Sequence, residues 1–152
     1  MQLLVDTNVL LRLVERDHPQ SHVAADATRA IRLAGHQLAM VPQIVYEFWV
    51  VATRPADANG LGLETDEARN ELLRLSPTLR LLRDERSIYE VWQALVVEHH
   101  VIGKRAHDAR IVAAMIRHGI SHLMTFNGSD FARYPSIAIV DPLIEGSFPT
   151  AV

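Results

Sequence analysis

The feature that most constrains the fold is the start of the chain, where a mainly apolar run, Met1-Gln2-Leu3-Leu4-Val5, stops abruptly at Asp6-Thr7-Asn8. Apolar residues at helical spacing follow directly, so the sequence predicts a buried strand, a polar tip and then a helix. In open α/β sheets, strand tips of this kind carry the chemistry. A carboxylate there is costly unless a cation or hydrogen-bond donors meet it, so Asp6 requires partners from elsewhere in the chain.

Strand-like and helix-like patterns alternate along the rest of the chain. We predict further strands at 37–41, 79–82, 121–126 and 137–140, and further helices at 20–34, 42–53, 65–75, 84–101 and 106–118. The Thr65 hydroxyl is expected to cap its helix, and Gly103 and Gly119 are expected to end the last two. Alternating strands and helices predict an α/β fold with a parallel sheet covered on both faces.

Length and composition indicate the class of protein. The 152 residues are the size of one domain, and a hydrophobic content of 49% is ordinary for a globular chain. No apolar run approaches the roughly 18 residues of a membrane span, and no signal region precedes the first strand, so we expect a cytoplasmic protein with no membrane contact. Because cysteine is absent, any metal must be held by oxygen or imidazole ligands.

Four carboxylates occur where solvated side chains are not expected. Asp6 ends the first strand and Asp130 follows the 121–126 strand, whereas Glu47 and Asp108 share the apolar stripes of their helices. Each acid alone has a simple structural explanation, a helix cap or an ion pair. Together they would need four separate compensations, but one divalent cation would compensate them all. Hard oxygen ligands favour Mg²⁺ or Mn²⁺.

Such a site predicts hydrolysis of phosphodiester bonds by a metal-activated water. Nearby hydroxyl and amide side chains are expected to help orient that water: Thr7, Asn8, Thr125, Asn127 and Ser129.

These residues resemble the PIN-domain ribonucleases, in particular the VapC-type toxins. The likeness rests on four segments in order along the chain: Val5-Asp6-Thr7-Asn8-Val9-Leu10-Leu11, Glu47, His107-Asp108-Ala109-Arg110-Ile111-Val112-Ala113-Ala114 and Thr125-Phe126-Asn127-Gly128-Ser129-Asp130-Phe131. The resemblance implies a single three-layer α/β/α, Rossmann-like PIN domain over residues 1–152. It also implies endoribonuclease activity that depends on Mg²⁺ or Mn²⁺, with RNA as substrate.

The resemblance further implies the site residues and the partners. By position, Asp6, Glu47 and Asp108 look like the three core catalytic and metal-binding acids, and Asp130 looks like the fourth. Asn127 occupies an alternative slot for that last acid. The resemblance implies a homodimer and a cognate VapB-type antitoxin, a basic or aromatic segment of which enters the acidic groove.

Basic and apolar residues bear on the partners. The net charge of −3 neither indicates nor excludes a nucleic-acid binder. Four basic residues near the last two acids are hypothesised to hold the RNA backbone, with solvated helix ends as the alternative: Lys104, Arg105, Arg110 and Arg133. One face of the 42–53 helix could contact a partner, with core packing as the alternative: Val45, Trp49 and Ala52. His107 is the only histidine expected near the site.

Two other functions remain open. A haloacid-dehalogenase-like phosphatase also begins with an aspartate at the tip of its first strand, but the second acid of that chemistry would fall at Asn8. The other is a catalytically inactive PIN module that only binds RNA or protein. Four retained acids argue against such a module, since negative charges repel RNA.

Overall fold

Five parallel strands form one sheet in the order β3-β2-β1-β4-β5, in a computed structural model that describes residues 1–151. The strands are β1 (Gln2–Val5), β2 (Gln37–Met40), β3 (Leu79–Leu81), β4 (His122–Met124) and β5 (Ala138–Val140). The central strand β1 pairs with β2 on one side and with β4 on the other. The direction of winding reverses between β1 and β4, and open α/β sheets place ligand sites at the carboxyl ends of such strands.

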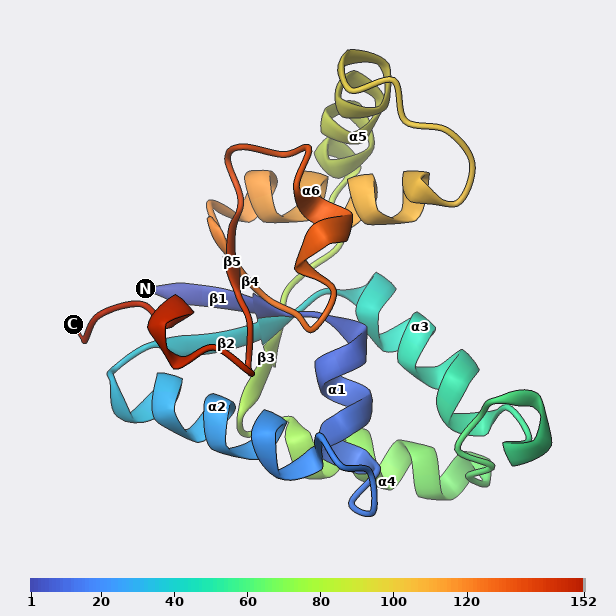
Figure 1. Cartoon of the computed structure of the whole chain (residues 1–152). Coiled ribbons are helices and arrows are strands. Elements are labelled where there is room, and N and C mark those ends of the chain that lie inside the picture. The colour runs from blue at the N-terminus through green and yellow to red at the C-terminus, as the bar shows by residue number, and fades with distance from the viewer. Residues whose placement is uncertain (152) are drawn as a thin grey trace.

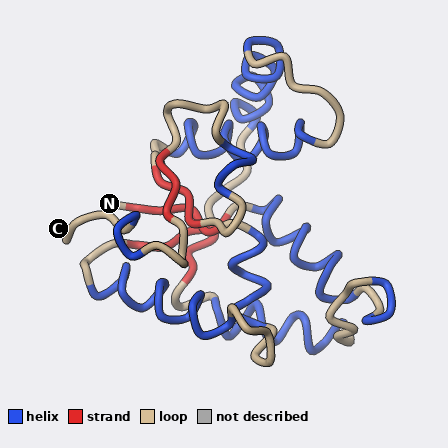
Figure 2. Tube along the Cα trace, in the orientation of Figure 1, coloured by secondary structure: helices blue, strands red, loops and turns tan. Residues whose placement is uncertain are grey.

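Six helices cover the sheet on both faces, as the alternating pattern predicts. Figure 1 shows α1 to α4 on one side of the strands and α5 and α6 on the other, and Figure 2 shows the strands enclosed between these groups. The helices are α1 (Thr7–Val14), α2 (Ser21–Leu33), α3 (Pro42–Thr53), α4 (Thr65–Leu75), α5 (Arg86–Glu98) and α6 (Arg105–His118). The three-layer α/β/α architecture is therefore confirmed. Within residues 1–151, no helix has the length and apolar character that crossing a bilayer requires.

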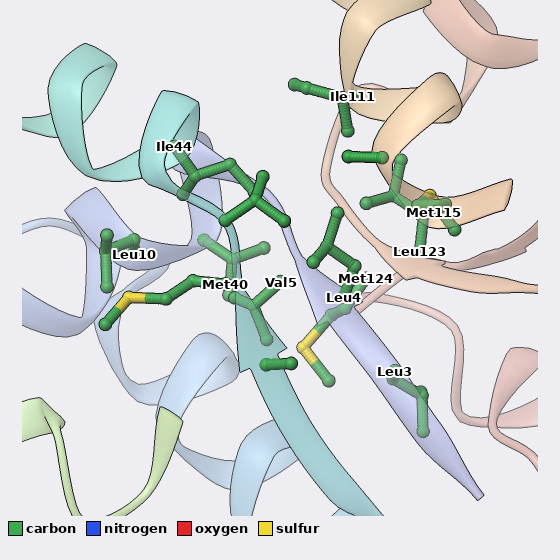
Figure 3. Close-up of a cluster of buried hydrophobic side chains, with 14 of the residues drawn as sticks. Leu3, Leu4, Val5, Leu10, Met40, Ile44, Ile111, Met115, Leu123 and Met124 are labelled. Carbon is green, nitrogen blue, oxygen red and sulfur yellow. The ribbon is translucent and has the colours of Figure 1, made fainter. Parts of the chain in front are cut away.

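The core lies on both faces of the sheet, around strands β1 and β4. Their apolar runs are fully buried, as expected for parallel strands sandwiched between helices. In Figure 3, Ile111 and Met115 of α6 approach these strands from one side, and Leu10 of α1 and Ile44 of α3 approach from the other. Helices α1, α3 and α6 are thus anchored by their apolar faces. The polar residues beside those faces are held at the ends of the strands.

Three short 3₁₀ helices lie between or after the main elements: Ala56–Ala58, Gly128–Phe131 and Glu145–Ser147. The second of them follows β4 directly and carries the fourth predicted acid. It occupies the stretch that was expected to be a simple turn and loop.

One expected helix cap and one expected helix end are wrong, although α4 itself spans the predicted residues. Thr65 is the first helical residue of α4 rather than its cap, because Glu64 takes the cap position and its N–H donates to Glu67 Oε2 at 2.8 Å. Helix α5 ends at Glu98, well before Gly103, because the backbone of His100 adopts a left-handed conformation with φ of 49°. Gly119 does end α6, with φ of 67°.

Candidate active site

The four predicted acids come together at the carboxyl ends of β1 and β4, although they lie on four separate elements. Asp6 follows β1 and caps α1, where its Oδ1 accepts a hydrogen bond from the Thr7 N–H at 2.7 Å. Glu47 lies on α3, Asp108 in the first turn of α6 and Asp130 in the 3₁₀ helix after β4. Three of these acids are close enough for their charges to interact. The charges of Glu47 and Asp108 both raise the pKa of Asp6.

Three of these acids line one open pocket of about 390 Å³. Its lining residues are Glu47, Lys104, Arg105, His107, Asp108 and Asp130. Asp6 is not among the lining residues and is only 7% exposed. The pocket wall therefore combines acidic side chains with basic ones from the start of α6. Among the histidines, His107 is the one that reaches it, as expected.

Asp6 is a buried carboxylate held only by neutral donors. Its Oδ2 accepts hydrogen bonds from the Thr125 hydroxyl at 2.7 Å and from the Asn8 side-chain amide at 3.0 Å. Burial, with a smaller contribution from the charges of Glu47 and Asp108, raises the pKa of Asp6 to about 6, and the hydrogen bonds from the Thr125 hydroxyl and the Thr7 N–H offset only part of that effect. Among the described residues, no arginine, lysine or histidine forms an ion pair with it. Its negative charge lacks a compensating cation.

Both polar ends of the Asn8 side-chain amide are engaged in hydrogen bonds. Besides bonding Asp6, its amide donates to Thr125 Oγ1 at 3.0 Å, and its Oδ1 accepts from the Phe126 N–H at 3.1 Å. An amide so placed ties β1 to the segment after β4 and has no proton to give as an acid. This arrangement disfavours the phosphatase chemistry, which needs a carboxylic acid at this position.

Glu47 is oriented by side chains from two elements. The Thr7 hydroxyl donates to its Oε2 at 2.8 Å, and the Gln43 amide donates to its Oε1 at 2.8 Å. The same Gln43 amide also donates to the His107 carbonyl oxygen at 2.9 Å, so it joins α3 to α6. Sequence reasoning missed Gln43. The signal that could have found it is a polar side chain one helical turn before Glu47 on a buried stripe.

Asp108 and Asp130 share one cation from the protein itself. The Arg105 guanidinium lies 2.6 Å from Asp130 Oδ1 and 3.4 Å from Asp108 Oδ2. Partial burial raises the pKa of Asp108, and the charge of Asp130 raises it further, whereas Arg105 lowers it. The two acids thus face a guanidinium rather than each other.

The four basic residues expected to bind RNA divide into two groups. Lys104 and Arg105 line the pocket. One guanidinium nitrogen of Arg110, Nη2, instead donates to both carboxylate oxygens of Asp84, at 2.8 and 3.0 Å, and Arg133 donates to the His99 carbonyl oxygen at 3.4 Å. Only the first two are placed to meet a substrate at the pocket.

The residues expected to orient water divide in the same way. Thr7, Asn8 and Thr125 are engaged with the acids through the hydrogen bonds above. The backbone N–H of Asn127 donates to Thr125 Oγ1 at 3.0 Å. Both Asn127 and Ser129 are exposed. They are therefore accessible to solvent, and neither is a lining residue of the pocket.

The donor set suits a hard divalent cation. It consists of carboxylate oxygens, backed by hydroxyl and amide groups, as Mg²⁺ and Mn²⁺ prefer. The uncompensated charge of buried Asp6 supplies an electrostatic reason for a cation to bind. As the side chains stand, no group of three or more histidine or acidic residues within residues 1–151 is close enough to chelate one ion. The Glu47 carboxylate is engaged by neutral donors, and Arg105 bridges Asp108 and Asp130.

Comparison with known proteins decides the family. The family model described as PIN domain matches residues 3–137 of the chain. This chain belongs to the PIN-domain family. Its identity as a PIN domain agrees with the α/β/α layers and with the gathering of acids at the carboxyl ends of β1 and β4.

This PIN domain also has named relatives. It is 27% identical over 150 residues to ribonuclease VapC24 of Mycobacterium tuberculosis, a match that covers 93% of this chain and 97% of that one. Solved structures with the same fold include VapBC2 of Rickettsia felis bound to a promoter DNA fragment (TM-score 0.68, 16% identity, 93% of this chain and 98% of that one). Another is M. tuberculosis VapC20, described as a sarcin-ricin loop cleaving toxin (TM-score 0.63, 18% identity, 87% and 95%). The resemblance to VapC-type proteins is confirmed.

Proposed function

We propose that this PIN domain is a VapC-type endoribonuclease that cleaves RNA phosphodiester bonds with the help of Mg²⁺ or Mn²⁺. One observation carries the proposal: acids from four elements meet at the ends of β1 and β4, and the buried one, Asp6, has only neutral partners. The name of the relative ribonuclease VapC24 supports the same class of reaction.

The acids have distinct positions for this chemistry. Asp6, Glu47, Asp108 and Asp130 hold the metal. A bound divalent ion supplies an activated water and Lewis acidity toward the phosphate. The remaining work belongs to the protein: Asn8 and Thr125 fix the orientation of Asp6, and hydrogen bonds to Thr7 and Gln43 fix that of Glu47.

The basic side chains at the pocket suit the substrate. Lys104 and Arg105 lie at the start of α6 and line the pocket beside the acids. A phosphodiester backbone brings negative charge to an acidic site, so nearby cations offset the repulsion. We assign Lys104 to the RNA backbone, because Arg105 is engaged by Asp108 and Asp130.

The proposal includes a VapB-type antitoxin and a second copy of the chain as partners. Structural neighbours that are toxin–antitoxin assemblies, from Haemophilus influenzae and Klebsiella pneumoniae among others, support the antitoxin. One face of α3 was suggested for a partner, with core packing as the alternative. Ala52 on that face is fully buried, so it packs in the core, and Val45 and Trp49 are half-buried against the core. The exposed apolar residues of α3 are instead Tyr46 and Val50, which suit a protein contact.

Cleavage of structured RNA tests the reaction. Purified protein is incubated with RNA and Mn²⁺ or Mg²⁺, with and without EDTA, and the products are resolved by size. We expect cleavage at internal positions of the RNA, and we expect EDTA to abolish it. Asp6→Asn or Asp108→Asn should lower the cleavage rate by several orders of magnitude. Asp57→Asn is the matched control, because Asp57 is an exposed aspartate in the first 3₁₀ helix. RNA binding without cleavage under every metal condition would identify a binding module instead.

A further inference from the structure

The guanidinium of Arg105 lies between two acids of the pocket. It is within 2.6 Å of Asp130 Oδ1 and 3.4 Å of Asp108 Oδ2. These are two of the four acids that the proposed function assigns to the metal. Arg105 comes from the first residue of α6 and the two acids from α6 and the 3₁₀ helix after β4, so the arginine also ties these segments together.

A guanidinium and a divalent ion are alternative counterions for the same oxygens. Carboxylates that bind a metal directly must turn their lone pairs toward it, and Arg105 occupies one oxygen of each of these two acids. The bridge engages two of the acids, and within residues 1–151 the acids do not form a chelating group of three or more as their side chains stand. Asp6 and Glu47, by contrast, have only neutral partners and need not release a charge.

We infer that Arg105 is a built-in competitor of the metal ion, which occupies the Asp108–Asp130 side of the pocket in the metal-free protein and is displaced when a divalent cation binds. The inference rests on the proposed function for the identity of the cation. Arg105 is a positioning residue, because it acts through the two acids. It keeps like charges from repelling one another in the absence of metal and lowers metal affinity.

The surroundings of Arg105 favour such an exchange. Its side chain is 43% exposed, so it can move into solvent without an energetic penalty for burial of its charge. Lys104 and His107 lie beside it on the pocket wall, and neither bridges the acids. Exchange therefore requires rearrangement of side chains, the Arg105 guanidinium and the carboxylates that it releases, and leaves the backbone of α6 in place.

Metal affinity of the metal-free protein tests the inference directly. Binding of Mn²⁺ to Arg105→Gln and to the wild type is measured by titration calorimetry, and Mn²⁺ electron paramagnetic resonance provides a second readout. Two partly exposed ion pairs are lost, so Arg105→Gln should bind Mn²⁺ about three- to thirtyfold more tightly. Arg105→Lys should lie between the two, because it keeps the charge and loses the planar fork.

Two further comparisons separate a specific bridge from a general charge effect. Arg32→Gln removes the same charge from an exposed position on α2 outside the pocket, and its Mn²⁺ affinity should match the wild type. In an Asp130→Asn background, the gain from Arg105→Gln should fall to less than half, since the shorter contact is already absent.

Thermal unfolding adds a readout that is independent of catalysis. Without metal, Arg105→Gln should unfold at a lower temperature than the wild type, and saturating Mn²⁺ should raise its Tm by more. Equal or weaker Mn²⁺ affinity in Arg105→Gln overturns the inference while leaving the proposed nuclease intact. RNA cleavage that persists in EDTA, with no Mn²⁺ binding by either protein, overturns both.

Discussion

The Thr7 hydroxyl donates a hydrogen bond to the Glu47 carboxylate, with 2.8 Å between Oγ1 and Oε2. This contact joins the first residue of α1 to α3 across 40 positions of sequence. Thr7 was expected to orient a water molecule, but the structure shows that its hydroxyl orients an acid.

The first prediction follows from this contact. Thr7→Val removes the hydroxyl with little change in shape, so Glu47 loses one of its two donors. Loss of such a supporting hydrogen bond typically lowers metal affinity or activity by about 10- to 100-fold. Mn²⁺ titration and RNA cleavage rates measure the effect. Thr7→Ser keeps the hydroxyl and should retain most of both, and a valine variant as active as the serine variant would contradict the assignment.

The second prediction concerns pH and the stability of the metal-free protein. The pKa of Asp6 is raised from 3.8 to about 6, so the folded state holds this proton more tightly than the unfolded chain does. The free energy of unfolding should therefore fall as pH rises from about 4 to about 6, by roughly 3 kcal/mol from this group alone. Urea unfolding in EDTA at several pH values measures it.

Asp6→Asn is the control for that measurement, because it cannot titrate. The difference in stability between wild type and Asp6→Asn should shift in favour of the variant as pH rises through this window. Parallel pH profiles for the two proteins would show that Asp6 has an ordinary pKa.

The third prediction distinguishes two basic residues. Lys104 lines the pocket, so Lys104→Ala should weaken RNA binding and reduce the slope of log affinity against log salt by about 0.7. Arg110 is paired with Asp84 outside the pocket lining, so Arg110→Ala should leave that slope unchanged. It should cost at most about 1 kcal/mol of stability, because the pair is partly exposed. Filter binding at several salt concentrations measures both slopes. A lower slope in Arg110→Ala and an unchanged slope in Lys104→Ala would show that Arg110, and not Lys104, contacts the RNA backbone.

The fourth prediction concerns Gly128, two residues before Asp130. A Cβ at Gly128 would lie 2.7 Å from Ile139 Cγ2 of β5, closer than side chains tolerate. Gly128→Ala should therefore cost about 1–3 kcal/mol of stability. It should also lower RNA cleavage, because the turn that carries Asp130 must shift. Chemical denaturation measures the first effect.

Matched variants test the cause of that loss. At Gly146 a Cβ would meet nothing within 4 Å, so Gly146→Ala should be nearly neutral. Ile139→Ala removes the methyl group that Gly128→Ala would strike, so the double variant should lose less than the two single losses combined. Strict additivity would show that the clash is not the cause.

The sequence alone predicts the layers and the strand-tip acids because both depend on local pattern. An apolar run that ends in Asp6, and helices whose apolar stripes include Glu47 and Asp108, carry that information in their spacing. Contacts between elements carry no such signal. The bond from Gln43 to the His107 carbonyl spans 64 positions and depends on how two helices meet.

The sequence also misjudges residues whose neighbours in space are not their neighbours in the chain. Arg105 and Arg110 look alike in sequence, as basic residues beside Asp108. The structure places the first between two acids of the pocket and pairs the second with Asp84, because they project from different sides of α6. Ala52 looked available to a partner, but it faces the core and is fully buried.

The central position of β1 has a consequence for how the protein is made. The ribosome releases this strand first, but one of its two neighbours, β4, ends only at Met124. Asp6 cannot acquire its bond from Thr125 until Thr125 has been synthesised and has left the ribosome. A nascent or prematurely terminated chain therefore has no assembled acidic pocket, so any toxicity should be confined to translation products that extend beyond β4.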